Sequence, residues 1–106
     1  MTPFEERVYA LCKQIPKGKV STYGAIARAL NSSPRAVGQA LKKNQFAPEV
    51  PCHRVVSSTG KIGGFMGETK GKNIERKIAL LKCEGILMTE GKIVDFNTIR
   101  SCHFSL

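Results

Sequence analysis

The chain has 106 residues, enough for one domain with a modest hydrophobic core and too few for two. No apolar run approaches the roughly 18 residues of a membrane span, and the N-terminal residues lack a signal-peptide pattern, so we expect an intracellular protein that works away from membranes. Seventeen basic against eight acidic side chains give a net charge of +9, which favours nucleic acid as partner. An ordinary lysine-rich surface is the alternative.

The first half of the chain predicts three short helices. Apolar residues recur at helical spacing over residues 3–14. Ser21 or Thr22 caps a second helix, and Ser33 followed by Pro34 begins a third, because the first helical position leaves its N–H unpaired and proline has none. Two short helices joined by the polar turn "NSS" are typical of a helix-turn-helix.

The predicted third helix, "PRAVGQALKKN", has a narrow apolar stripe and a basic face. The basic face recurs at i, i+4, i+7 and i+8 and consists of Arg35, Gln39, Lys42 and Lys43. Small residues make this helix slim, so its backbone can approach another surface closely. Two interpretations are open: a helix that binds DNA, or one side of a helical hairpin with a solvated face.

The second half predicts an extended segment over residues 46–58 and a basic, glycine-rich loop. A fourth helix over residues 73–83 follows, with Gly85 as its left-handed cap, and then a hairpin around residues 89–92. We therefore expect a fold that is mainly α with a small β component, a winged-helix-like helix-turn-helix, in a single domain of residues 1–106.

The stretch "VPCHRVV" places a thiol beside an imidazole. A cysteine is nucleophilic only as thiolate, so His53 would serve as its base and Arg54 would add positive potential. Neighbouring side chains of an extended segment point to opposite faces, so Cys52 and His53 need a water or a bend between them. Glu84 is the acid placed to orient the imidazole. The alternative is an inert core cysteine. With no C-x-x-C pair, we expect no metal site and no disulfide.

"PCHRVV" closely resembles the active-site signature of the O6-alkylguanine-DNA alkyltransferases, which repair alkylated guanine by moving the alkyl group onto their own cysteine. "IPKGKVSTYGAIARAL" is similar to that family's helix-turn-helix segment, and "PRAVGQALKKN" to its recognition helix. "SSTGKIGGF" resembles the loop after the cysteine, and "RKIALLKCEG" the helix that ends in Glu-Gly. The resemblance covers about residues 4–86, the family's DNA-binding and active-site domain only.

The resemblance implies roles for four residues at the reacting centre. Cys52 would accept the alkyl group, and His53 would act as its base through a water. Glu84 would orient the imidazole, and Asn44 would tie the recognition helix to the active-site segment. No cofactor and no metal are implied, and the thioether product would limit each molecule to one transfer.

The resemblance also implies how DNA is held. The alkylated guanine would be flipped out of the duplex, because its O6 substituent is out of reach in the stack. Arg35 would take the place of the extruded base, and Tyr23 would press on the neighbouring phosphate. The remaining implied contacts are Ala36, Gly38 and Gln39 at the minor groove, Lys42 and Ser58 on the DNA, and Phe65, Met66 and Gly67 around the lesion. The implied partner is double-stranded DNA containing O6-alkylguanine, bound by a monomer.

Two departures and two alternatives accompany this hypothesis. The loop "ETKGKNIE" is longer than usual for the family, and Met66 stands where some members have a polar residue. An alkyltransferase-like lesion sensor would bind the flipped base without transfer, but proteins of that type commonly replace the cysteine with tryptophan. A winged-helix transcription regulator would explain the net positive charge, but it would give no function to Cys52, His53 and Glu84.

Overall fold

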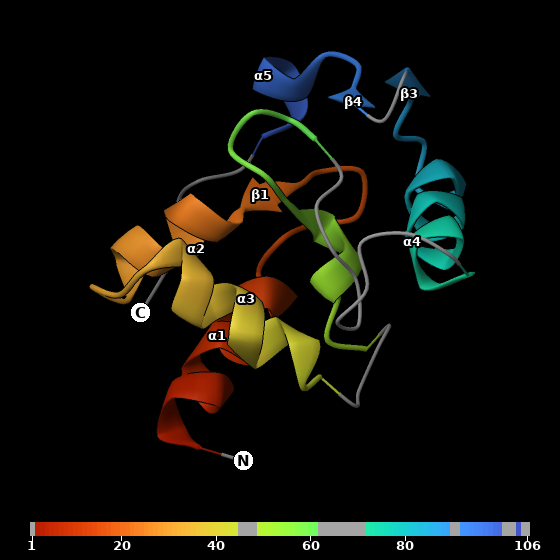
Figure 1. Ribbon diagram of the computed structural model, residues 1–106. Helices are drawn as coiled ribbons and strands as arrows, with labels where there is room; N and C mark the ends of the chain where they lie inside the picture. Colours follow the sequence, from red (N-terminus) through yellow and green to blue (C-terminus); the bar gives the residue numbers. More distant parts are fainter. Residues whose placement is uncertain (1, 45–48, 62–71, 90–91, 101–103, 105–106) are drawn as a thin grey trace.

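The computed structural model describes residues 2–44, 49–61, 72–89, 92–100 and 104. Helices surround one small central sheet, with α1 at one end of the molecule and the C-terminal hairpin and α5 at the other (Figure 1). The four longer helices are α1 (Pro3–Lys13), α2 (Tyr23–Ala29), α3 (Pro34–Lys42) and α4 (Lys72–Cys83). The predicted fold class, mainly α with a small β component and a helix-turn-helix, is confirmed.

The helices begin where the local capping signals predict. The side chain of Thr22, rather than that of Ser21, accepts a hydrogen bond from the Ala25 amide at 2.9 Å and caps α2. Ser33 caps α3 in the same way, with Pro34 at the first helical position. α4 ends before Gly85, whose φ of +85° confirms the predicted left-handed cap.

The segment that leads into the central sheet is only partly extended. Strand β1 (Ser21–Thr22) pairs in parallel with β2 (Val55–Val56). Immediately before β2, however, Cys52–Arg54 form a single 3₁₀ turn, η1. The prediction of an extended chain is wrong there because Pro51, at φ −81° and ψ 65°, closes a tight turn in which the Cys52 amide donates to the Val50 carbonyl at 2.8 Å.

The C-terminal part confirms the predicted hairpin and adds an unexpected helix. β3 (Met88–Thr89) and β4 (Lys92–Ile93) pair antiparallel, while residues 90–91 of the predicted turn lie outside the described residues. A short helix, α5 (Phe96–Ile99), follows. The Val20 amide donates to the Ile99 carbonyl at 3.1 Å, so this tail lies beside the central sheet.

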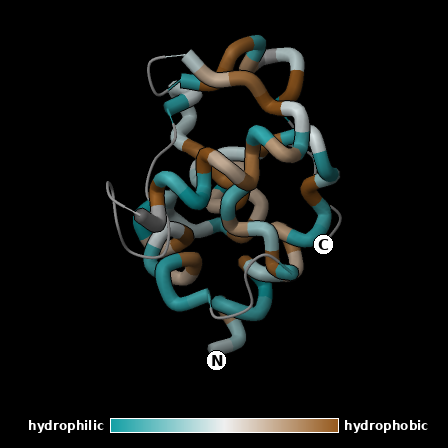
Figure 2. The backbone as a smooth tube through the Cα atoms, turned by 90° about the vertical axis from the view of Figure 1, so that its right-hand side faces the viewer, coloured by the Kyte–Doolittle hydropathy of each residue, from teal (hydrophilic) through white to brown (hydrophobic). Residues whose placement is uncertain are grey.

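Two groups of buried side chains hold the elements together. The larger one joins α1, α2 and α3 to η1 and β2, and the smaller one lies between the central sheet, α4 and the hairpin. Hydrophobic and hydrophilic residues alternate along the chain in Figure 2, as expected of elements that bury one face.

A buried hydrogen bond adds to this packing. The Tyr9 hydroxyl donates to the Ala40 carbonyl at 2.7 Å and fixes α1 against α3. No helix among the described residues has the length and apolarity needed to cross a membrane.

Replacing two glycines by alanine is expected to change stability in opposite directions. An added Cβ meets no atom within 4 Å at either Gly38 or Gly85, so only the backbone differs. Gly38→Ala lies within α3 and should stabilise the protein by about 0.5–1 kcal/mol. Gly85→Ala forces a side chain into the left-handed region and should destabilise it by about 1–2 kcal/mol. Urea unfolding of both variants checks this, and a shift of the same sign in both would contradict it.

Candidate active site and nucleic-acid interface

The Glu84 carboxylate joins the two residues that follow Cys52. Its Oε2 lies 2.8 Å from His53 Nε2 and accepts a second hydrogen bond from Arg54 Nη2 at 2.8 Å, while its Oε1 accepts from Arg54 Nε at 2.9 Å. The Glu84 side chain is 9% exposed and that of His53 is 2% exposed. Burial raises the pKa of Glu84, but the hydrogen bonds from Arg54 and His53 outweigh it and leave that pKa below its ordinary value. Glu84 is therefore a carboxylate at neutral pH.

Arg54, which was expected to act near the Cys52 thiol, binds Glu84 and the end of α1. Its Nε and Nη2 donate to the Glu84 carboxylate. Its Nη1 donates to the Ile15 carbonyl at 2.8 Å, just beyond the end of α1. The charge of Arg54 is thus paired with that of Glu84, and the expectation that Arg54 adds positive potential at the thiol stays a prediction. Arg54 also fixes η1 between α1 and the end of α4.

The 3₁₀ turn also fixes which nitrogen of His53 faces away from Glu84. Nε2 engages Glu84, and the buried Nδ1 has no hydrogen-bond partner among the described residues. Burial lowers the pKa of His53, and the opposing hydrogen bond and charge of Glu84 do not fully offset it. The imidazole is therefore neutral at neutral pH. It can take up a proton on Nδ1 while Glu84 holds Nε2–H.

Cys52 lies inside the larger group of buried side chains and is only 4% exposed. Burial raises the pKa of its thiol, against the interaction with the Asn44 side chain and the positive charge of Lys77. Asn44 is buried after the end of α3, and its Nδ2 donates to the Val50 carbonyl at 3.1 Å. The end of α3 and the turn that carries Cys52 are thus tied together.

Lys77 is the residue of the site that sequence reasoning missed. It lies on α4, is fully buried, and its Nζ donates to the Val55 carbonyl at 2.9 Å. Burial lowers the pKa of Lys77 to about 7, against the opposing effect of the Cys52 thiolate. Its spacing contained the signal, because Lys77 stands three residues after Ile74 and four before Leu81, on the apolar stripe of the helix.

The residues expected to meet DNA lie on α2, α3 and the turn after β2. Arg35, Gln39 and Lys42 are exposed on α3, while Val37, Ala40 and Leu41 are buried, as the pattern predicts. Ala36, Gly38 and Tyr23 are half-buried, and Ser58 is exposed. Phe65, Met66 and Gly67 lie outside the described residues. Within the described part of the chain, no three metal-ligating side chains come together.

The chain resembles known sequences over most of its length. Residues 3–86 match the family described as 6-O-methylguanine DNA methyltransferase, DNA binding domain. A methylated-DNA–protein-cysteine methyltransferase of Thermococcus kodakarensis is 49% identical over 87 residues, which are 81% of this chain and 47% of that protein. The chain spans about half the length of the curated relatives it matches.

Solved structures of DNA complexes share the fold. Mycobacterium tuberculosis OGT in complex with DNA is 41% identical with a TM-score of 0.69, over 79% of this chain and 50% of that one. S. pombe Atl1 in complex with damaged DNA containing O6-carboxymethylguanine is 34% identical with a TM-score of 0.78, over 95% of this chain and 96% of that one. The likeness to Atl1 therefore extends beyond residue 86, where the family match ends.

Glu84→Gln is expected to destabilise the protein in a pH-dependent way. Because the pKa of Glu84 is lowered by folding, its carboxylate stabilises the fold above the ordinary glutamate pKa, and that stabilisation is lost as the pH falls through the lower, folded value. Glu84→Gln should therefore cost about 3 kcal/mol at neutral pH, by leaving Arg54 unpaired, and less below about pH 4. Urea unfolding over a pH series measures this, with the exposed Glu6→Gln as control. A cost that does not change with pH would contradict the assignment.

Proposed function

We propose that this chain, which belongs to the 6-O-methylguanine DNA methyltransferase family, removes the alkyl group from O6-alkylguanine in double-stranded DNA by transferring it to its own Cys52. One observation carries the proposal: a buried thiol lies next in the chain to a neutral, buried imidazole that a carboxylate orients. A core cysteine has no need of such a neighbour. The names of the relatives support the same reaction.

The proposed reaction balances without a cofactor. The Cys52 proton passes through a water to His53 Nδ1, and the Glu84 carboxylate stabilises the imidazolium that results. The thiolate attacks the alkyl carbon, so that a carbon–sulfur bond forms as the carbon–O6 bond breaks. The guanine leaves with the electron pair of that bond and takes up a proton. A thioether has no route back to a thiol here, so each molecule performs one transfer.

Lys77 supports this chemistry through charge. Burial makes the Cys52 thiol a weak acid, which protects it at rest and would also slow its reaction. A buried ammonium close to the developing thiolate stabilises that charge strongly, because little water screens it. Lys77 therefore lowers the cost of forming the nucleophile, and its bond to the Val55 carbonyl holds it in place.

The exposed face of α3 supports the choice of DNA as partner. Arg35, Gln39 and Lys42 present cationic and polar groups to solvent, and Gly38 leaves open space beside the helix. We assign Arg35 to the space left by the flipped base and Tyr23 to the adjacent phosphate. Ala36, Gly38 and Gln39 face the minor groove, and Ser58 contacts the DNA beyond it.

A second candidate function is binding of the lesion without transfer. The match to S. pombe Atl1, a protein solved with damaged DNA containing O6-carboxymethylguanine, covers 95% of this chain. Cys52 and its network favour transfer over binding alone.

The two functions are separated by the mass of the protein after exposure to the lesion. Incubation with duplex DNA carrying O6-methylguanine should add one methyl group, on the peptide that contains Cys52. Cys52→Ala should gain no mass and still bind the DNA. Intact-mass and peptide mass spectrometry measure this, with unmodified DNA as control. Tight binding without any mass change would contradict alkyl transfer and favour binding of the lesion alone.

Lys77→Met is expected to move the pH dependence of transfer rather than abolish folding. Methionine keeps the length and apolar stem of lysine and removes the charge. With a pKa of about 7, Lys77 is charged in roughly half of the molecules at neutral pH. Without that charge the thiol becomes a weaker acid, so the rate of transfer should fall by up to about ten-fold at neutral pH, and the two proteins should converge as the pH rises and Lys77 itself loses its proton. Single-turnover rates over a pH series measure the shift, with the exposed Lys82→Met on the same helix as control. An unchanged pH profile would remove Lys77 from the mechanism.

A further inference from the structure

Two lysines from distant parts of the chain lie directly opposite each other. Lys61, at the end of the turn after β2, and Lys92, in β4, form an antiparallel bridge, and the Ile93 amide donates to the Gly60 carbonyl at 2.9 Å. Both residues are exposed. Like charges directly opposite each other across a strand pair are destabilising, so the two lysine side chains add nothing to the stability of the isolated chain.

The backbone holds this pair rigidly relative to the active site. The Ser57 amide donates to the Lys61 carbonyl at 3.0 Å and the Gly60 amide donates to the Ser57 carbonyl at 2.9 Å, which closes the turn directly after β2. Gly60, at φ +86°, packs so closely on Phe96 that an added Cβ would lie 3.2 Å from its ring. The two lysines thus keep a fixed position relative to Cys52, which precedes β2.

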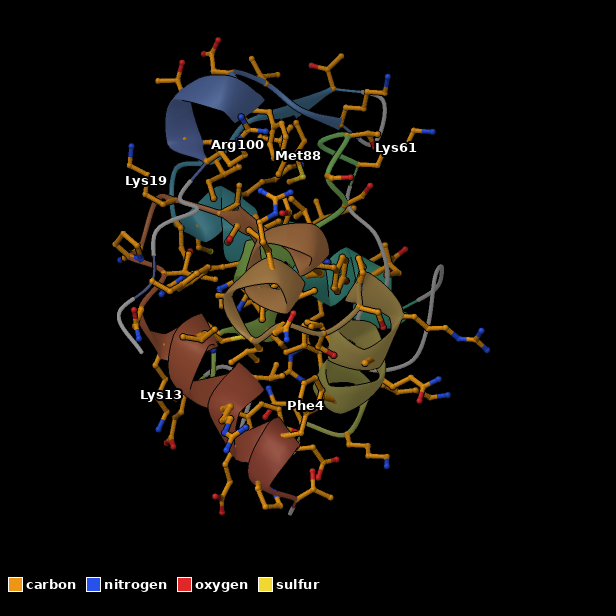
Figure 3. The ribbon with its side chains drawn as sticks, turned by 90° about the vertical axis from the view of Figure 1, so that its left-hand side faces the viewer. Phe4, Lys13, Lys19, Lys61, Met88 and Arg100 are labelled. Carbon is orange, nitrogen blue, oxygen red and sulfur yellow. The ribbon has the colours of Figure 1, made fainter. Side chains whose placement is uncertain are left out.

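The pair lies on the side of the molecule that also carries α3. In Figure 3 the Lys61 side chain points to the same side as α3, while Lys13, at the end of α1, points to the other. Ser58, already assigned to DNA, belongs to the same turn as Lys61. The turn and the hairpin therefore extend the cationic face of α3 beyond the helix-turn-helix.

We infer that Lys61 and Lys92, the wing pair, contact phosphates of the DNA backbone at a second site outside the recognition helix. This inference rests on the proposed function, because it takes double-stranded DNA as the partner. A bound phosphate offsets the repulsion between the two ammonium groups, which gives a reason for two lysines at these positions. Phosphate contacts carry no sequence information, so the pair positions the duplex and strengthens its binding to damaged and undamaged DNA alike.

The salt dependence of DNA binding tests the wing pair. Each phosphate contact contributes about 0.9 to the slope of log affinity against log salt concentration. Lys61→Ala/Lys92→Ala should therefore reduce that slope by about 1 to 2, on undamaged and on O6-methylguanine duplex DNA equally. Lys61→Arg/Lys92→Arg, which keeps the charge, should keep the slope. Lys13→Ala/Lys17→Ala removes the same charge near the end of α1 and should also keep it. Fluorescence anisotropy with a labelled duplex measures all four proteins.

The outcomes separate this inference from the function on which it rests. If the wild-type protein binds and repairs DNA but Lys61→Ala/Lys92→Ala keeps the full slope, the wing pair does not contact phosphate and the proposed function stands. An equal loss in Lys13→Ala/Lys17→Ala would overturn the inference too, since total charge would then explain the effect. No binding by the wild-type protein would overturn both proposals. Urea unfolding checks folding, and the alanine variant should be no less stable than wild type, because it relieves the repulsion.

Discussion

The buried carboxylate of Glu84 is the interaction on which the site depends. It accepts hydrogen bonds from His53 and from two nitrogens of Arg54, and Arg54 extends the connection to the Ile15 carbonyl beyond α1. A buried charge is tolerated only when it is paired and hydrogen-bonded. Here one carboxylate meets that requirement with the same contacts that orient the His53 imidazole, so stability and the proposed chemistry rest on the same atoms.

Glycines supply the backbone conformation that this network needs. Gly85 takes a left-handed conformation immediately after Glu84 and ends α4 there. Gly18, also at positive φ, passes close to the same point, where an added Cβ would lie 3.6 Å from the Glu84 carbonyl. The chain leaving α1 and the chain leaving α4 therefore come together around Glu84. The two glycines allow that course of the chain because both adopt a left-handed backbone conformation, which residues with a Cβ resist.

The sequence predicts most of the helices, because their signals are local. Caps at Thr22 and Ser33 and the terminator Gly85 act on residues within one turn, and the turn signal of the hairpin is equally local. The 3₁₀ turn at Cys52 was missed because it follows from the Pro51 backbone rather than from side-chain periodicity. α5 is fixed by remote contacts to Val20 and Gly60, which no local pattern records.

At the site, the family resemblance identifies the residues of the proposed reaction. The residues that hold those side chains in place are not evident from the sequence. The resemblance assigns roles to Cys52, His53 and Glu84, whereas the contacts of Arg54 and Lys77 follow from the three-dimensional fold. The sequence suggests that Arg54 is a cation beside the thiol, and the structure shows that its guanidinium pairs with the Glu84 carboxylate. Lys77 looks like a surface lysine until its amine is found buried against the Val55 carbonyl.

The parallel pairing of Ser21 with Val55 has a consequence for how the protein folds. Contacts between residues far apart in the sequence close long loops and form late. Glu84 and Lys77 join the site from still further along the chain. An incompletely folded molecule therefore carries an ordinary cysteine, with neither the imidazole oriented nor the ammonium in place. Under the proposed single transfer, the thiol would thus become reactive only once the fold that binds DNA is complete.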